Sequence, residues 1–142
     1  MGTRSKISFI KRYDKGINEH LVSVYQQYDG YIEGVGYELA NYLKSKKIIN
    51  GIPGGVDTSN LANGFECLVA QFIRDFKVDV GGLYITTEDN YQEYNYNVIF
   101  DEQLYIHNPS DNVDDYIIIE VDKFKGTPSE LLEYKEEYED DE

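Results

Sequence analysis

The sequence predicts an α+β fold in which a mostly antiparallel sheet of about five or six strands is covered by two central helices. Three observations predict this class. Two segments with alternating apolar residues surround an early turn, a strongly amphipathic segment follows in the middle of the chain, and the alternation returns after it. With 142 residues, of which 41% are hydrophobic, the chain has the size and composition of one folded domain.

The first part of the chain predicts a hairpin that leads into a helix. Ile7 and Phe9 alternate with polar neighbours, and the alternation returns after an Asp-Lys-Gly turn, so residues 5–13 and 20–28 are expected to pair as antiparallel strands. Residues 33–44 place apolar side chains at helical spacing and end in lysines, which suit the negative end of a helix. The glycines between strand and helix match no phosphate-binding motif and lie beside acidic residues, so they are interpreted as an architectural corner.

The strongest helical pattern lies in residues 61–77, where apolar residues form one broad stripe. We expect this segment to be the core helix, with one of the polar residues 57–60 as its N-cap. The glycine-rich residues 51–55 before it predict a loop. Asn63 and Gln71 are then amides within the core helix, and they are expected either to tie the helix to the corner or to line a small pocket.

Beyond the core helix the pattern has a period of two. Residues 83–85 and 94–100 alternate as strands do, and we expect them to be neighbours joined by the polar turn 88–91. Residues 104–108 are a further strand candidate. Residues 116–121 are apolar on both faces almost throughout, which is typical of a central strand.

The C-terminal region predicts a short helix and an acidic tail. The sequence Thr127-Pro128-Ser129-Glu130 resembles a helix start. We assign residues 1–129 to a single α+β domain and residues 130–142 to an acidic helix and tail, whose last residues are expected to fray. No apolar run approaches the roughly 20 residues of a membrane-spanning helix, so we expect a cytoplasmic protein.

Charge is the strongest compositional signal. The net charge is −14, of which residues 130–142 contribute −7, residues 1–16 contribute +4 and residues 17–129 contribute −11. An acidic body therefore exists independently of the tail. The negative electrostatic field of this body repels nucleic acids and anionic membranes and attracts basic protein surfaces. The alternative is that the acidity serves only to keep the chains apart in solution.

The chain also contains 14 tyrosines and no tryptophan. Tyrosine serves half-buried strands and protein interfaces alike, because an apolar ring carries a polar tip. Carboxylates spaced along turns can imitate DNA phosphates and occupy the basic groove of a nucleic-acid-binding protein, or they can be ordinary solvated charges. The residues that we expect to contact such a partner are Tyr28, Asp29, Tyr31, Glu33, Glu88, Asp89, Glu93, Asp111, Asp114 and Asp115.

A second candidate site is a pocket for a nucleotide or another small ligand. Gly54 and Gly55 precede the predicted core helix, where free backbone N–H groups can bind an anion, although Asp57 beside them opposes phosphate. We expect these glycines to share one concave site with Asn63 and Gln71. The simpler interpretation of the glycines is a flexible loop between two helices.

Residue types that carry catalysis are present without a recognisable arrangement. His20 and His107 lie in separate strand candidates and have no partners at metal-ligand spacing, so no metal and no cofactor are predicted. Cys67 is the single cysteine and lies beside the apolar stripe, as expected of a structural thiol in a reducing compartment. No catalytic residue is assigned.

Several stretches resemble a family of small phage, viral and bacterial proteins that has no assigned activity: VYQQYDGYIEGVGYELANYL, IINGI, NGFECLVAQFIRDFK and GGLYI. The shared pattern lies within residues 24–85 and combines an Asp-Gly-Tyr strand end, a Gly-x-Gly helix start, an Asn-Gly and a helix ending in Ala-Gln-x-Ile-x-x-Phe-Lys. The chain departs from the pattern at Ile32, where proline is expected. The resemblance implies a viral or mobile-element setting, in which small acidic proteins block host proteins, and it transfers no catalytic residue.

These observations lead us to expect a non-enzymatic interaction protein, encoded by a phage or virus, that blocks a basic nucleic-acid-binding host protein such as a defence nuclease. Direct contact with nucleic acid or with a membrane is not expected. The alternatives are a small enzyme or ligand-binding protein that uses the Gly54 pocket, and an oligomer whose tyrosines bury a self-interface.

Overall fold

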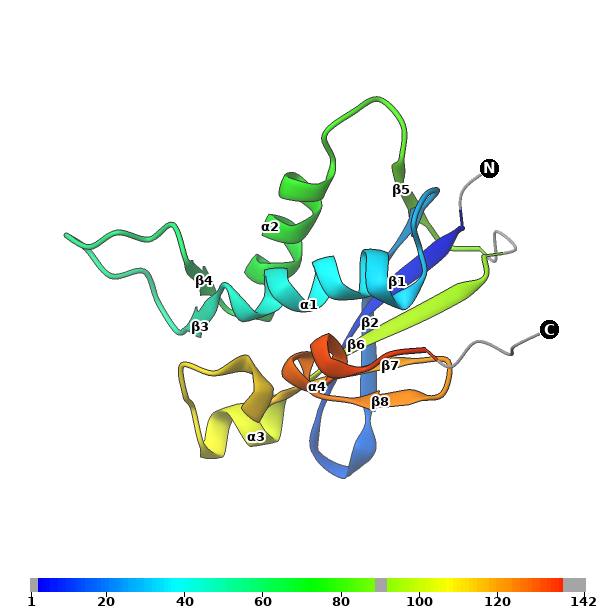
Figure 1. Cartoon of the computed structure of the whole chain (residues 1–142). Coiled ribbons are helices and arrows are strands. Elements are labelled where there is room, and N and C mark those ends of the chain that lie inside the picture. The colour runs from blue at the N-terminus through cyan, green and yellow to red at the C-terminus, as the bar shows by residue number, and fades with distance from the viewer. Residues whose placement is uncertain (1–2, 89–91, 137–142) are drawn as a thin grey trace.

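The centre of the molecule is a six-stranded sheet in the order β5-β2-β1-β6-β7-β8 (Figure 1). The computed structural model describes residues 3–88 and 92–136. Neighbouring strands are antiparallel except for β1 and β6, which are parallel, so the predicted α+β class with a mostly antiparallel sheet is confirmed. The strands of this sheet are β1 (Ser5–Arg12), β2 (Asn18–Gln26), β5 (Leu83–Thr86), β6 (Tyr94–Asp101), β7 (Ile117–Val121) and β8 (Phe124–Gly126).

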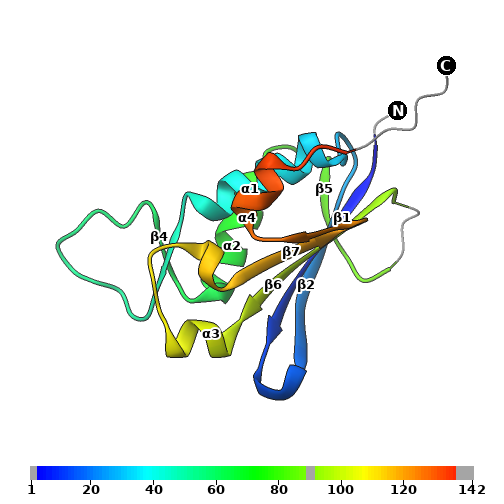
Figure 2. The ribbon, with the colours of Figure 1, turned by 60° about the horizontal axis from the view of Figure 1, so that its bottom comes forward.

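The helices are α1 (Tyr37–Lys44), which continues a π-helix at Ile32–Gly36, α2 (Phe65–Phe76), α3 (Glu102–His107) and α4 (Pro128–Glu133). Figures 1 and 2 show α1, α2 and α4 on one face of the sheet. Residues alternate between the two faces of a strand, and Phe9 of β1 points to the helical side, where its ring contacts Phe65 and Phe72 of α2. Leu131 of α4 belongs to the same buried cluster, so α4 packs with the body. No helix in the described ranges is long and apolar enough to cross a membrane.

Several elements follow the local sequence pattern. β1 and β2 form the predicted hairpin, and β7 is the predicted interior strand, since it lies between β6 and β8. α4 begins at the predicted cap, where the Thr127 hydroxyl accepts the N–H of Glu130 at 3.1 Å and the Glu130 carboxylate accepts the N–H of Thr127 at 2.8 Å. Local capping chemistry therefore sets where α4 starts.

The core helix begins later than the apolar stripe predicts. α2 starts at Phe65, and the segment Leu61–Asn63, which we expected to be helical, forms the strand β4. β4 pairs in parallel with β3 (Lys47–Ile49) in a separate two-stranded sheet. Gly64 then takes a φ of +93°, outside the helical region, and turns the chain into α2. A pairing partner that lies far away in the sequence has overridden the helical pattern at these three positions.

Short polar side chains explain two further differences from the prediction. The predicted N-cap of the core helix is wrong, because the Asp57 carboxylate accepts the N–H of Ser59 at 3.0 Å within the loop. Residues 104–108, which we expected to be a strand, lie in α3 and its end. The Asp101 carboxylate accepts the N–H of Leu104 at 3.0 Å, so a cap at the end of β6 starts a helix there.

The strand order also differs from the prediction. β5 and β6 are not neighbours, because the β1–β2 hairpin lies between them. Three strands of three residues each, β3, β4 and β8, were not predicted. Segments of this length are too short to show a periodic pattern, and their partners decide their conformation.

The chain passes from β2 into the π-helix through a corner with very close backbone contacts. A Cβ atom on Gly34 would lie 2.4 Å from the carbonyl oxygen of Asp29, and a Cβ atom on Gly30 would lie 2.7 Å from the Cβ of Ser5. Both distances are shorter than side chains tolerate. The glycines of the corner therefore serve close packing.

Gly34→Ala is expected to lower the free energy of unfolding by about 1–3 kcal/mol, because the added methyl group overlaps the Asp29 carbonyl. Gly54→Ala is the matched control: nothing lies within 4 Å of a Cβ at that position, so the expected change is within about 0.5 kcal/mol. Urea unfolding followed by circular dichroism measures both changes. Equal stability of the two variants would contradict this account of the corner.

Candidate functional site

The corner between β2 and α1 presents two tyrosines and two carboxylates on a rigid frame. Tyr96 of β6 anchors the corner to the sheet, since its hydroxyl donates a hydrogen bond to the Gly30 carbonyl at 2.7 Å. Burial raises the pKa of Tyr96 well above its ordinary value, so the hydroxyl stays protonated and remains a donor. The carbonyl of Asp29, which has a φ of +59°, accepts the N–H of Val35 at 2.8 Å. The exposed residues of this frame, which we call the corner surface, are Tyr28, Asp29, Tyr31 and Glu33.

Glu93 lies next to the corner surface. The N–H of Gly30 donates to the Thr3 carbonyl at 2.9 Å, and the adjacent Arg4 donates its backbone N–H to the Glu93 carboxylate at 2.9 Å. This hydrogen bond lowers the pKa of Glu93, and the Arg4 guanidinium lies 3.5 Å from the same carboxylate. Glu88 is exposed in the preceding turn, and Asp89 lies outside the described residues.

The other predicted contact residues lie elsewhere. Asp114 contacts the ammonium of Lys44, the last residue of α1, at 3.2 Å. Since the corner precedes the π-helix and α1, about 13 helical residues, or roughly 20 Å, separate the two places. Asp111 pairs with Lys47 at 3.6 Å, and Asp115 accepts the Ser110 hydroxyl at 2.6 Å. The structure thus divides the predicted acidic residues between the two ends of α1.

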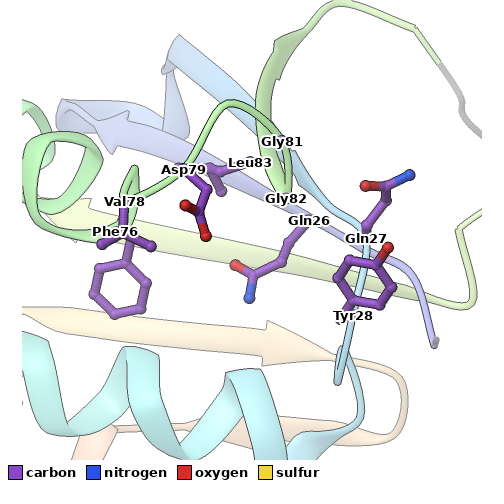
Figure 3. Close-up of a pocket in the computed structure, with 9 residues that line it drawn as sticks. All are labelled: Gln26, Gln27, Tyr28, Phe76, Val78, Asp79, Gly81, Gly82 and Leu83. Carbon is purple, nitrogen blue, oxygen red and sulfur yellow. The ribbon is translucent and has the colours of Figure 1, made fainter.

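A groove that the sequence did not indicate begins at the corner surface and runs along α1. It consists of two pockets, of about 350 and 640 Å³, that share Gln26, Phe76 and Val78. Figure 3 shows the first pocket, in which Asp79 and Gln26 point into the space between Phe76 and Tyr28. The second pocket is lined in addition by Glu38, Asn41, Tyr42, Ser45 and Asp75. We call the two pockets together the corner groove.

Three carboxylates and no cationic side chain line the corner groove: those of Glu38, Asp75 and Asp79. Asp75 is already compensated, because hydrogen bonds from Arg74 and from the Tyr42 hydroxyl hold its pKa at about 2. Burial and this carboxylate raise the pKa of Tyr42. Glu38 and Asp79 form no ion pair with any residue that the structure describes. The groove therefore offers two uncompensated negative charges beside aromatic rings.

Two lysines near the corner groove are engaged elsewhere. The Lys77 ammonium donates to the Leu83 carbonyl at 2.8 Å and lies 5.1 Å from the centre of the Tyr84 ring. The buried Lys46 donates to the Ser59 carbonyl at 3.0 Å. Neither lysine is among the residues that line the groove, although the Lys46 ammonium lies 5.4 Å from the centre of the Tyr42 ring and its charge helps to lower the pKa of Asp75.

A separate pocket of about 170 Å³ lies under the loop of residues 50–60. Asn63 and Gln71 both line it, as the sequence predicts for a ligand pocket, whereas Gly54 and Gly55 are not among its lining residues. The pocket is lined by Ile49, Ile52, Pro53, Thr58, Leu61, Asn63, Cys67 and Gln71. We call it the loop pocket.

The two amides of the loop pocket have different roles. Asn63, which belongs to β4 and not to the core helix, accepts the N–H of Gly51 at 2.8 Å and so anchors the loop. Gln71 of α2 donates its side-chain N–H to the Leu61 carbonyl at 3.0 Å. Its Oε1 atom is buried and accepts no hydrogen bond from a described residue. A buried acceptor without a donor is costly, which makes Gln71 the chemically informative residue of this pocket.

The histidines form no catalytic arrangement. His20 Nε2 lies 2.7 Å from Ser23 Oγ, which in turn lies 2.6 Å from Ser8 Oγ, but Ser23 is only 2% exposed and a substrate cannot reach it. His107 bonds Gln103 within α3. Within residues 3–88 and 92–136, no three His, Cys, Asp or Glu side chains are grouped so that they could hold a metal ion.

No protein-family model, curated protein or solved structure matches this chain. Tyr28 belongs to both the corner surface and the groove, so these two features form one continuous region. That region suits a cationic macromolecular partner, whereas the loop pocket has room only for a small molecule.

Asp114→Asn is expected to lower the free energy of unfolding at pH 7 by about 1.5 kcal/mol, because the carboxylate accepts hydrogen bonds from Ser129 and Lys44. Burial alone would raise the pKa of Asp114, but these partners outweigh it and lower the pKa. The stabilisation is therefore present above the ordinary carboxyl value of 3.8 and is lost as the pH falls through the lowered folded-state pKa.

Urea unfolding between pH 7 and pH 3 checks this expectation, with Asp115→Asn as the control. The exposed Asp115 accepts a hydrogen bond from Ser110, and its replacement should cost less than that of Asp114. The difference between the wild-type chain and Asp114→Asn should shrink toward the acid end. A difference that stays constant with pH would show that the carboxylate charge does not matter.

Proposed function

We propose that this chain is a non-enzymatic interaction protein that binds a basic protein and occupies its nucleic-acid-binding surface. The observation that carries the proposal is the corner surface, where Tyr28, Asp29, Tyr31 and Glu33 stand exposed on a rigid frame. Asp29 and Glu33 form no ion pair with a described residue. Exposed carboxylates on a chain with a net charge of −14 attract cationic surfaces, and exposed tyrosines supply contact area.

The charge supports one class of partner above others. A basic nucleic-acid-binding surface is shaped to receive spaced negative charges, and an acidic protein can compete for it. The resemblance to small phage, viral and bacterial proteins supports a setting in which the partner is a host protein, for which a defence nuclease is the natural class. In this proposal the paired carboxylates of Asp111 and Asp114 stabilise the fold, and the unpaired carboxylates of the corner meet the partner.

The immobilised chain is expected to retain a basic nucleic-acid-binding protein from host lysate at low salt and to release it at high salt, because the attraction is screened. Asp29→Asn combined with Glu33→Gln should weaken retention at least about fivefold. Addition of the free chain should displace DNA from the retained protein.

The control is the pair Asp14→Asn and Asp57→Asn, which removes the same charge from the hairpin turn and the loop of residues 50–60, both distant from the corner (Figure 1). This pair should change retention less than about twofold. Equal losses in both double variants would show that only net charge matters. Retention that does not depend on salt, or that leaves DNA binding intact, would refute the proposal.

The loop pocket supports a second candidate function, the binding of a small planar molecule. The supporting observation is the buried Oε1 atom of Gln71, which accepts no hydrogen bond from the described part of the chain and lies in a pocket lined mostly by apolar side chains. A ligand that pairs with this atom needs an N–H or O–H donor. A pocket of about 170 Å³ suits a single aromatic ring.

Phenol is expected to bind the loop pocket more tightly than toluene, because the two molecules have almost the same shape and only phenol carries a donor. Gln71→Met should abolish this preference, since it removes the acceptor and keeps the volume. Chemical-shift titration of the backbone amides of residues 61–71 measures both affinities. Equal shifts with phenol and toluene in the wild-type chain would exclude a donor-recognising site.

A further inference from the structure

The corner groove has the features that recognise one particular side chain. We propose that it seats an arginine of the basic partner, with the guanidinium beside Phe76, the ring that lines both pockets, and between the pocket that Asp79 lines and the pocket that Glu38 lines. This inference rests on the proposed function and deepens it, because it names the chemical group that the partner inserts. It adds a specific contact to the diffuse attraction between opposite charges.

The aromatic wall of the groove is held firmly. The Phe76 ring stacks on Phe72 with a distance of 4.1 Å between ring centres, and Tyr42 meets Phe76 edge-on at 5.4 Å. Phe76 is therefore fixed by two neighbours while part of its surface lines the groove. A rigid ring loses little conformational freedom when a flat cation stacks on it.

The polar groups of the groove match a donor-rich cation. Asp79 and Glu38 are acceptors that form no ion pair within residues 3–88 and 92–136, and the amides of Gln26 and Asn41 supply further carbonyl oxygens. An arginine side chain offers five N–H donors and no acceptor. An anion would be repelled, and an apolar occupant would leave the carboxylates without a partner as it displaced their water.

Arginine fits this site better than lysine. Its guanidinium is planar, stacks on aromatic faces, binds carboxylates through two parallel hydrogen bonds and is less strongly hydrated than an ammonium. The groove provides both an aromatic wall and carboxylates, whereas a site built from carboxylates alone would not distinguish the two cations. A second copy of this chain is a poor occupant, because two chains with a net charge of −14 repel each other.

The test uses two fluorescein-labelled peptides, Gly-Arg-Gly-Arg-Gly-Arg-Gly and its lysine counterpart, and fluorescence anisotropy with the full chain. We expect the arginine peptide to bind at least about threefold more tightly than the lysine peptide. Asp79→Asn combined with Glu38→Gln should lower the affinity for the arginine peptide about tenfold and remove the preference for arginine over lysine. Circular dichroism of these surface variants checks that the fold is retained.

The pair Asp14→Asn and Asp57→Asn again serves as the matched control and should weaken binding less than about twofold. Equal weakening by both pairs, or equal affinity for the two peptides, would overturn the arginine site and leave the charge-based proposed function standing. If the corner variants Asp29→Asn and Glu33→Gln abolish retention of the lysate partner while the groove variants change nothing, the groove is likewise excluded. The absence of any salt-sensitive binding to peptides or lysate proteins would instead reject the proposed function itself.

Discussion

The hydrogen bond between the Tyr96 hydroxyl and the Gly30 carbonyl fixes the place where sheet and helices meet. Tyr96 is fully buried in β6, the strand that joins the β1–β2 hairpin to β7. Its bond to the corner sets the position of the π-helix and α1 relative to the sheet. Gly36 at the end of the π-helix leaves room for the Tyr96 ring, since a Cβ atom there would lie 3.1 Å from the Tyr96 hydroxyl oxygen. The corner surface is built on this frame, and Tyr28 before it and Glu38 after it line the corner groove.

The charges of the molecule are used in two ways. Lys11 lies 3.0 Å from Glu66 and 3.3 Å from Glu102, and although burial opposes its charge, these carboxylates raise the pKa of Lys11 to about 12. This ammonium joins β1, α2 and α3 through opposite charges. The carboxylates of Glu38 and Asp79, by contrast, have no cationic partner in the described part of the chain. Compensated charges thus join separate elements of the body, and two of the uncompensated carboxylates line the corner groove.

Sequence patterns predicted those elements whose cause is local. Alternation predicted the β1–β2 hairpin, and the side chain of Thr127 predicted the start of α4. The patterns failed where a distant segment decides the conformation: Leu61–Asn63 belong to the apolar stripe of the core helix but pair with β3. The loop pocket was partly predictable, since Asn63 and Gln71 are amides in apolar surroundings. The corner groove could not be predicted, because the fold brings together three segments that lie far apart in the sequence. The one sequence feature that points to it is the pair Val78 and Val80 on either side of Asp79, which the structure shows to be exposed.

The parallel pairing of β1 with β6 has a consequence for the synthesis of the chain. Ser5 pairs with Tyr94, so the chain as far as β6 must leave the ribosome before the two middle strands of the sheet can meet. Until then the nascent hairpin carries an open edge along β1, and folding waits for a contact between distant segments, which is slow to form. During this interval Lys6, Lys11 and Arg12 place positive charges along the open strand β1, and charged side chains on an edge strand oppose edge-to-edge association on a polysome. The basic residues of β1 therefore also protect the hairpin before β6 has been made.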